Sequence, residues 1–158
     1  MHRRAILLVA AASLVLLLGI SGLRPHDCLT WVLEVFPIIV VLPVLFLTYR
    51  RFPLTTLLYA LIFVHAVVLM VGGHYTYARV PIGFAIAKVF GLHRNPYDKI
   101  GHFAQGFVPA IAAREVLVRG RYIRTRAMLS FVVISIVLAI SAAYELFEWA
   151  SAVALGQG

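Results

Sequence analysis

Long uncharged stretches dominate the hydrophobic pattern of the chain, and turn residues or arginines bound each of them. Each stretch has at least about 20 residues, which is the length that an α-helix needs to cross the hydrocarbon core of a bilayer. None shows the alternation of apolar and polar residues that is typical of a membrane β-barrel. The pattern predicts an all-α, polytopic transmembrane helix bundle of about five spans, at residues 5–23, 31–49, 53–73, 100–118 and 127–155.

One further helix is predicted between the third and fourth spans, at residues 81–92. These residues are mostly apolar with a single Lys88, and Tyr75, Tyr77 and Tyr97 flank them. Tyrosine is enriched at the depth of the lipid headgroups. We therefore expect an amphipathic helix that lies in the membrane interface.

The composition agrees with a membrane protein. Hydrophobic residues make up 63% of the chain and charged residues 13%, against about 45–50% and about 25% in soluble domains. The sequence has no repeats or low-complexity tracts, so we expect a single membrane domain over residues 1–158. The start "MHRR" followed by apolar residues also suits a secretory signal peptide, but the apolar run exceeds the usual 7–15 residues, which favours a retained span.

Basic residues are concentrated on one predicted side of the membrane. Nine of the 14 Lys and Arg lie before the first span, between the second and third, or at and between the fourth and fifth. The positive-inside rule then places the amino terminus in the cytoplasm and residues 74–99 outside. The net charge of +8 thus serves membrane topology and contact with lipid headgroups, and no nucleic-acid partner is expected.

Unusual polar residues gather at the predicted outer ends of the spans. Asp98 and His102 are four residues apart and Glu145 and Glu148 three apart, so each pair shares one helix face. His74 directly follows the third span. Carboxylates and imidazoles at one depth are typical ligands of a divalent cation or members of an acid–base site. We expect His74, Asp98, His102, Glu145 and Glu148 to hold a divalent cation, and His102, Glu145 and Glu148 to act as acid–base groups.

Several of the unusual polar residues also have a simpler explanation. Asp98 alone would suit the amino terminus of its helix as a cap, and His102 alone would suit a polar contact between helices. Glu148 could lie at headgroup level beside Trp149. His65, in the middle of the third span, is expected to form a hydrogen bond between helices.

Three functions fit this pattern. The first is a site at the outer membrane face that binds a cation or acts as acid and base on a lipid-linked or periplasmic substrate. The second is a proton- or cation-coupled transport component in which Glu34 and His65 lie deeper, and the third is a non-catalytic membrane scaffold subunit. Because the predicted inner half of the spans is nearly free of ionisable residues, the outer-face site ranks above transport. No sequence motif fixes a reaction, so enzyme activity stays undecided.

Three stretches of the sequence resemble the YjdF-like family of bacterial inner-membrane proteins: "GGHYTYARVPIG", "RNPYDKIGHFAQGFVPAIAARE" and "SAAYELFEWASAVALGQG". The resemblance implies a multi-pass protein of the bacterial inner membrane whose biochemical function is uncharacterised. It also implies that such chains continue past "LGQG" with an aspartate-rich stretch and one more helix, so that acidic residues beyond Gly158 would complete the site. A shorter similarity to VanZ-like membrane proteins rests on the "DK" and "H" that open one span and the glutamate pair that ends the next.

Overall fold

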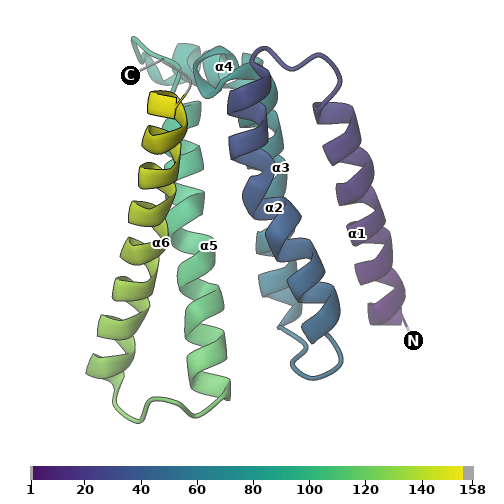
Figure 1. The fold of residues 1–158 in the computed structure, drawn as a ribbon, viewed down its shortest axis with the longest axis vertical. Helices are drawn as coiled ribbons and strands as arrows, with labels where there is room; N and C mark the ends of the chain where they lie inside the picture. The colour runs from purple at the N-terminus through teal and green to yellow at the C-terminus, as the bar shows by residue number, and fades with distance from the viewer. Residues whose placement is uncertain (1, 155–158) are drawn as a thin grey trace. The chain divides into compact units, whose positions relative to one another are not determined.

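A computed structural model describes residues 2–154, and it is helical throughout (Figure 1). The α-helices are α1 (His2–Ser21), α2 (Cys28–Thr48), α3 (Thr56–Tyr75), α4 (Pro81–Phe90), α5 (Tyr97–Arg119) and α6 (Arg126–Ala154). A short 3₁₀ helix, η1 (Tyr77–Arg79), lies between α3 and α4. The prediction of an all-α protein is confirmed. Residue 155, at the end of the predicted fifth span, lies outside the described residues.

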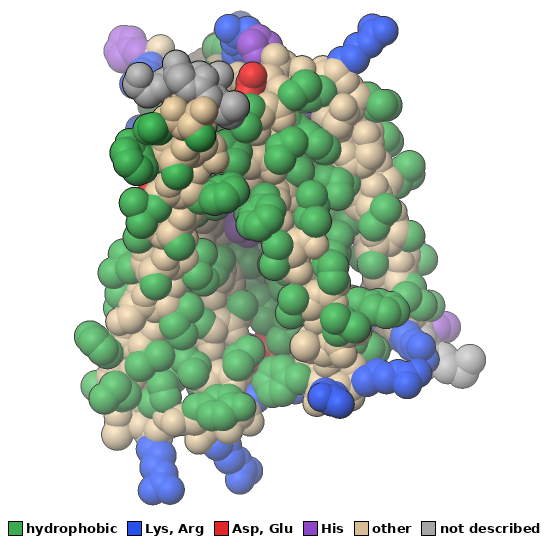
Figure 2. Space-filling model, in the orientation of Figure 1, with side chains coloured by type: hydrophobic (Ala, Val, Ile, Leu, Met, Phe, Trp, Pro, Cys, Tyr) green, Lys and Arg blue, Asp and Glu red, His purple; other side chains and the backbone are tan. Residues whose placement is uncertain are grey.

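Four helices of the described chain are long and apolar enough to cross a membrane: α1, α2, α3 and α6. They correspond to the first, second, third and fifth predicted spans. α5 occupies the fourth and has 23 residues, but charged residues near both of its ends, such as Asp98 and Arg119, make it less apolar. The crossing of the membrane by α5 therefore stays a prediction. Figure 2 shows hydrophobic side chains over the middle of the visible helices and Lys and Arg side chains at their ends.

The chain divides into two compact units, residues 1–103 and 104–158. Unit 1 contains α1 to α4 and the first two turns of α5, and unit 2 contains the rest of α5 and α6. The expectation of a single membrane domain stays a prediction.

The core of unit 1 lies where α3 packs against α1 and α2. It consists of six buried apolar residues, contributed by all three helices: Leu14, Val35, Ile38, Ala66, Leu69 and Met70. Most of the other large apolar side chains of these helices are exposed. Exposure of this kind suits a lipid environment, because lipid tails are as apolar as leucine side chains.

Polar side chains mark where α2 and α3 begin. Asp27 Oδ1 accepts a hydrogen bond of 2.7 Å from the backbone N–H of Thr30, and Thr55 Oγ1 accepts one of 3.3 Å from that of Leu58. Such N-caps satisfy donors that the first helical turn leaves unpaired. Asp27 lies in the connection before α2, outside the spanning segment, and the hydrogen bonds from Thr30 lower the pKa of its carboxyl below the ordinary value of 3.8.

The two ends of unit 1 differ in chemistry. We call the end where α1 begins and where α2 connects to α3 the basic end, defined by Arg3, Arg4, Arg50 and Arg51 (Figure 1). We call the opposite end the tyrosine end, defined by Tyr75, Tyr77 and Tyr97. The carboxylates of unit 1 all lie toward the tyrosine end, and they are Asp27, Glu34 and Asp98.

α4 forms where the sequence predicts an interfacial helix. It begins at Pro81, which suits the first turn, and Gly91 caps its carboxyl end with a φ of 63°. Gly83 and Ala87 are buried, whereas several large apolar residues are exposed: Ile82, Phe84, Val89 and Phe90. An exposed apolar face of this kind fits a helix that lies in the membrane interface.

Unit 2 is a helical hairpin. Residues 104–119 of α5 and the helix α6 run antiparallel and are joined by the short connection 120–125 (Figure 1). Near this connection, the Arg119 guanidinium forms an ion pair of 2.6 Å with Glu115 Oε1. A short connection between two helices is typical of antiparallel neighbours.

Candidate functional site

Glu34 is the one carboxylate that is buried among residues 2–154, with 8% of its surface exposed. It lies in the second turn of α2, toward the tyrosine end. Its Oε2 accepts a hydrogen bond of 2.7 Å from the hydroxyl of Tyr77 in η1. A buried carboxyl group is costly without a hydrogen-bonding partner, so the Tyr77 hydroxyl offsets part of the cost of placing Glu34 in an apolar helix.

Glycines make the close approach of Glu34 and Tyr77 possible. A Cβ atom on Gly73 would lie 3.0 Å from Glu34 Cβ, and one on Gly72 would lie 2.5 Å from Tyr77 Cζ. On the other side, a Cβ atom on Gly101 would lie 2.5 Å from Tyr77 Cε1. Any larger residue at Gly72 or Gly101 would therefore force the Tyr77 ring to move. The ring lies in a slot between two glycines of α3 and α5.

Tyr97 forms the neighbouring wall of this slot. Its ring centroid lies 5.9 Å from that of Tyr77, with an angle of 47° between the planes. Tyr97 is buried, and its hydroxyl donates a hydrogen bond of 3.3 Å to the carbonyl of Val68 in α3. The start of α5 is thereby tied to α3 beside the Glu34–Tyr77 pair.

Asn95 fixes the segment that carries both tyrosines. Its Nδ2 donates to the carbonyls of Ala78 at 3.2 Å and Val80 at 2.9 Å, and its Oδ1 accepts from the backbone N–H of Tyr97 at 3.0 Å. One amide side chain thus joins the 3₁₀ helix to the first residue of α5. It holds Tyr77 and Tyr97 at a fixed separation across the intervening α4.

His74, one of the predicted metal ligands, contacts the last residue of α1. Its Nδ1 lies 2.8 Å from the carbonyl oxygen of Ser21. Since a carbonyl only accepts, Nδ1 carries the proton, and Nε2 of a neutral His74 is the acceptor. The Ser21 hydroxyl also accepts a hydrogen bond of 3.1 Å from Nε1 of Trp31. His74 therefore joins α3 to α1 at the tyrosine end. A backbone contact of this type also orients histidines that bind metals.

Asp98 and His102 face each other on the first two turns of α5. Asp98 Oδ1 lies 3.5 Å from His102 Nε2, and both side chains are 59% exposed. The side chain that accepts a backbone N–H at the start of α5 is that of Asn95, not Asp98. Asp98 instead occupies the first turn, where a negative charge interacts favourably with the helix dipole. The pair is open to groups that approach from outside.

The other two predicted site residues, Glu145 and Glu148, lie three positions apart on α6 in unit 2, where Glu145 is exposed and Glu148 half-buried. Within the described part of either unit, no three His, Cys, Asp or Glu side chains are grouped as metal ligands. Asp98 and His102 belong to unit 1, so their predicted meeting with Glu145 and Glu148 stays a prediction.

The hydrogen bond expected for His65 between helices is not formed. Its Nε2 is buried in the middle of α3 and has no hydrogen-bond partner among residues 2–154. A buried polar nitrogen without a partner is uncommon. The prediction was wrong because a position within an apolar span does not show whether a partner lies on the neighbouring helix.

The sequence interpretation missed the roles of Tyr77, Tyr97 and Asn95. It assigned both tyrosines to headgroup depth and gave Asn95 no role. Glycine residues were the sequence signal that could have revealed these roles. Gly72, Gly73 and Gly101 lie within two predicted spans, and glycine inside a regular element often marks a close approach of another group.

Comparison with known proteins identifies the family. Residues 6–158 match the family described as predicted membrane protein (DUF2238). The chain belongs to this family. It is 58% identical over 153 residues to the inner membrane protein YjdF of Escherichia coli (strain K12), an alignment that covers 97% of this chain and 73% of the relative. No solved structure matches this DUF2238 chain. The predicted resemblance to YjdF-like proteins is confirmed, and the chain is a membrane protein of the bacterial inner-membrane type.

Proposed function

We propose that this DUF2238 protein carries an acid–base site at the outer face of the inner membrane, with Glu34 as its central group. The observation that supports the proposal is the 2.7 Å hydrogen bond from Tyr77 to the carboxyl group of Glu34, a residue that is 8% exposed. Ionisable residues within membrane-spanning helices are costly and are usually functional. Glu34 is such a residue, and two glycines position the Tyr77 ring beside it.

The hydrogen bond can persist while Glu34 exchanges a proton. A tyrosine hydroxyl can donate to a carboxylate, and it can also donate to the carbonyl oxygen of a protonated carboxyl group. Tyr77 would therefore hold the orientation of Glu34 in both forms. A general acid or base needs this fixed geometry relative to the group that it protonates or deprotonates.

We propose that the exposed Asp98–His102 pair exchanges protons or binds a cation between the Glu34 site and the outside. Its carboxylate and imidazole are groups that exchange protons or bind a divalent cation, and the pair is open to solvent or headgroups. In this proposal Glu145 and Glu148 supply further cation ligands or acid–base groups, and His74 supports them. The substrate would be lipid-linked or periplasmic, because the proposed topology opens the tyrosine end to that side.

The first experiment tests the proton role of Glu34. Infrared difference spectra between acidic and alkaline pH, recorded on the protein in nanodiscs, should contain a carboxyl band that Glu34→Gln removes. Tyr77→Phe should shift this band, whereas Tyr75→Phe should leave it unchanged, because Tyr75 lies at the same end but is exposed. If the spectra of Glu34→Gln and wild type are identical wherever the protein stays folded, the acid–base proposal is wrong and a scaffold role replaces it.

The second experiment tests the cation. The metal content of the protein purified in detergent should fall in His102→Ala and Glu145→Gln but not in His93→Ala, which removes an exposed histidine before α5. The same two variants should impair the cellular function of the gene while the protein stays inserted. A protein without bound metal whose Glu34 still titrates would indicate acid–base chemistry alone.

Proton-coupled transport is the second candidate, and His65 favours it. Its Nε2 is buried without a partner in the described chain, about two helical turns from Gly73 on the same helix. Proteoliposomes with a trapped pH-sensitive dye would show proton flux under an applied potential, and His65→Phe and Glu34→Gln should each abolish it. Equal fluxes in protein-free liposomes and in liposomes with the wild type would exclude this candidate.

A further inference from the structure

A groove runs between α1, α2 and α3 toward the basic end of unit 1. Its volume is about 480 Å³, within the range of about 300–1,000 Å³ that is typical of ligand pockets. Apolar residues of all three helices line its walls, among them Leu7, Leu14, Leu42, Leu45, Ile62 and Phe63. The walls suit a hydrocarbon chain.

Two arginines lie at the groove, Arg4 from the start of α1 and Arg50 after α2. Both are exposed, and neither guanidinium has a hydrogen-bond or ion-pair partner within residues 2–154. Because the carboxylates of unit 1 all lie toward the tyrosine end, no acidic residue of this unit neutralises them. The groove therefore combines apolar walls with two unneutralised positive charges.

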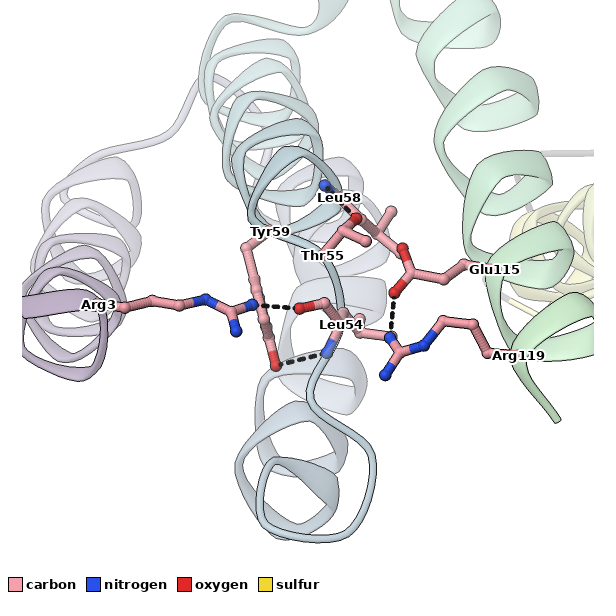
Figure 3. A network of polar contacts seen from close by, with 7 residues as sticks. All are labelled: Arg3, Leu54, Thr55, Leu58, Tyr59, Glu115 and Arg119. Atoms are coloured by element: carbon pink, nitrogen blue, oxygen red, sulfur yellow. Dashed lines mark hydrogen bonds and ion pairs between the residues drawn. The ribbon is translucent and has the colours of Figure 1, made fainter. Parts of the chain in front are cut away.

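A neighbouring arginine is already engaged in holding this end together. Arg3 donates a hydrogen bond to the carbonyl of Leu54, and its guanidinium lies 5.9 Å from the ring centroid of Tyr59 (Figure 3). The backbone N–H of Leu54 donates to the Tyr59 hydroxyl at 3.4 Å, and the Tyr59 and Tyr49 rings lie 6.4 Å apart. Both tyrosines also line the groove. Arg3 thus holds the rim of the groove in place, and Arg4 and Arg50 remain available to bind a ligand.

We propose that this groove binds an anionic phospholipid, with an acyl chain along the apolar walls and the phosphate group between Arg4 and Arg50. Guanidinium groups bind phosphate through paired hydrogen bonds, and basic pockets between membrane helices bind anionic lipid headgroups. An uncharged hydrophobic occupant would leave both arginines unpaired, and a free phosphate ion would leave the apolar walls empty. The inference is independent of the acid–base site, which lies at the other end of unit 1.

Native mass spectrometry of the protein released from mixed nanodiscs tests the proposal. The probes are phosphatidylglycerol and zwitterionic phosphatidylethanolamine with identical acyl chains. We expect one retained phosphatidylglycerol per chain in preference to phosphatidylethanolamine. The double variant Arg4→Gln/Arg50→Gln should lower that preference roughly thirty-fold, since each arginine near a headgroup contributes about 1 kcal/mol. The matched variant Lys88→Gln/Arg94→Gln removes two exposed charges from the other end of unit 1 and should keep it.

A further variant tests the acyl-chain part. Ala11→Trp places a large side chain in the groove wall, so it should reduce lipid retention while both arginines remain. Inorganic phosphate, added as a competitor, should displace the lipid only at far higher concentration. Equal retention of the two lipids by the wild type, or unchanged preference in Arg4→Gln/Arg50→Gln, would overturn the proposal. A dimer without bound lipid would instead assign the groove to a second copy of the chain.

Discussion

The hydroxyl of Tyr77 donates a hydrogen bond of 2.7 Å to Oε2 of Glu34, although the two residues are 43 positions apart in the sequence. The bond connects the second turn of a spanning helix to a 3₁₀ helix outside it. It gives the buried carboxyl group a defined partner and a defined direction. The tyrosine end of unit 1 is organised around this contact, because Gly72, Gly101 and Tyr97 all touch or border the Tyr77 ring.

Tyr77→Phe should destabilise unit 1 by about 1 kcal/mol, because the hydrogen bond from Tyr77 to Glu34 is lost while the ring still fills the slot. The measurement is unfolding in detergent followed by tryptophan fluorescence, and Trp31 packs near Gly73 beside the site. Tyr75→Phe is the matched control, since this tyrosine is 39% exposed. Equal losses in both variants would mean that the hydroxyl contact with Glu34 contributes nothing specific.

Gly72→Ala should displace the Tyr77 ring and destabilise the protein by more than Tyr77→Phe does, because the added methyl group would lie 2.5 Å from Tyr77 Cζ. Gly19→Ala in α1 is the control, with no atom within 4 Å of the added Cβ. It should raise the stability by about 0.5–1 kcal/mol, the usual advantage of alanine within a helix. An unchanged stability of Gly72→Ala would show that the slot is wider than the Tyr77 ring requires.

Asp27 should make the stability of unit 1 depend on pH in the acid range. Its pKa is lowered in the folded protein by the hydrogen bonds from Thr30. A carboxyl group with a depressed pKa contributes stability above its unfolded pKa, and this contribution is lost as the pH falls through the folded value. Unfolding measured from pH 5 downward should therefore show a loss below about pH 3.8 that Asp27→Asn, which keeps a capping side chain, does not share.

Labelling of single cysteines tests the predicted topology. In a Cys28→Ser background, which removes the one native and exposed thiol, Arg94→Cys should react with a membrane-impermeant maleimide from the periplasmic side. Arg51→Cys, at the basic end, should react only after the membrane is opened. The reverse pattern would place the amino terminus outside and would move the Glu34 site to the cytoplasmic face.

The helices could be predicted from the sequence because the hydrocarbon core of a bilayer allows few backbone structures other than helices. A run of about 20 apolar residues must satisfy its backbone hydrogen bonds internally, and α1, α2, α3 and α6 follow that rule. α4 was also predictable, from its apolar residues, its first proline and its flanking tyrosines. α5 shows the limit of the argument, because its length suits a span while its charged ends do not.

The candidate site was predictable only as far as spacing along one helix determines it. The contact between Asp98 and His102 forms because residues four apart on a helix are neighbours. The contact between Glu34 and Tyr77 could not be derived in this way. Tyr77 reaches Glu34 because η1 carries it there and because glycines leave room for its ring. The unpartnered His65 illustrates the same limit, because hydrogen bonds between helices depend on how the helices are rotated against each other.

The sequence distance between Glu34 and Tyr77 has a consequence for how the protein is made. A ribosome that adds about 5–20 residues per second produces Glu34 roughly 2–9 s before the tyrosine that will bind it. During that interval α2 must enter the bilayer before Tyr77 can bind its carboxyl group, and a charged residue within the bilayer costs up to about 2.5–3.5 kcal/mol. Most residues of α2 are Leu, Ile, Val or Phe, and ten such residues already offset about 3 kcal/mol during insertion. The rich apolar composition of α2 therefore lets the nascent chain insert before its polar pair is complete.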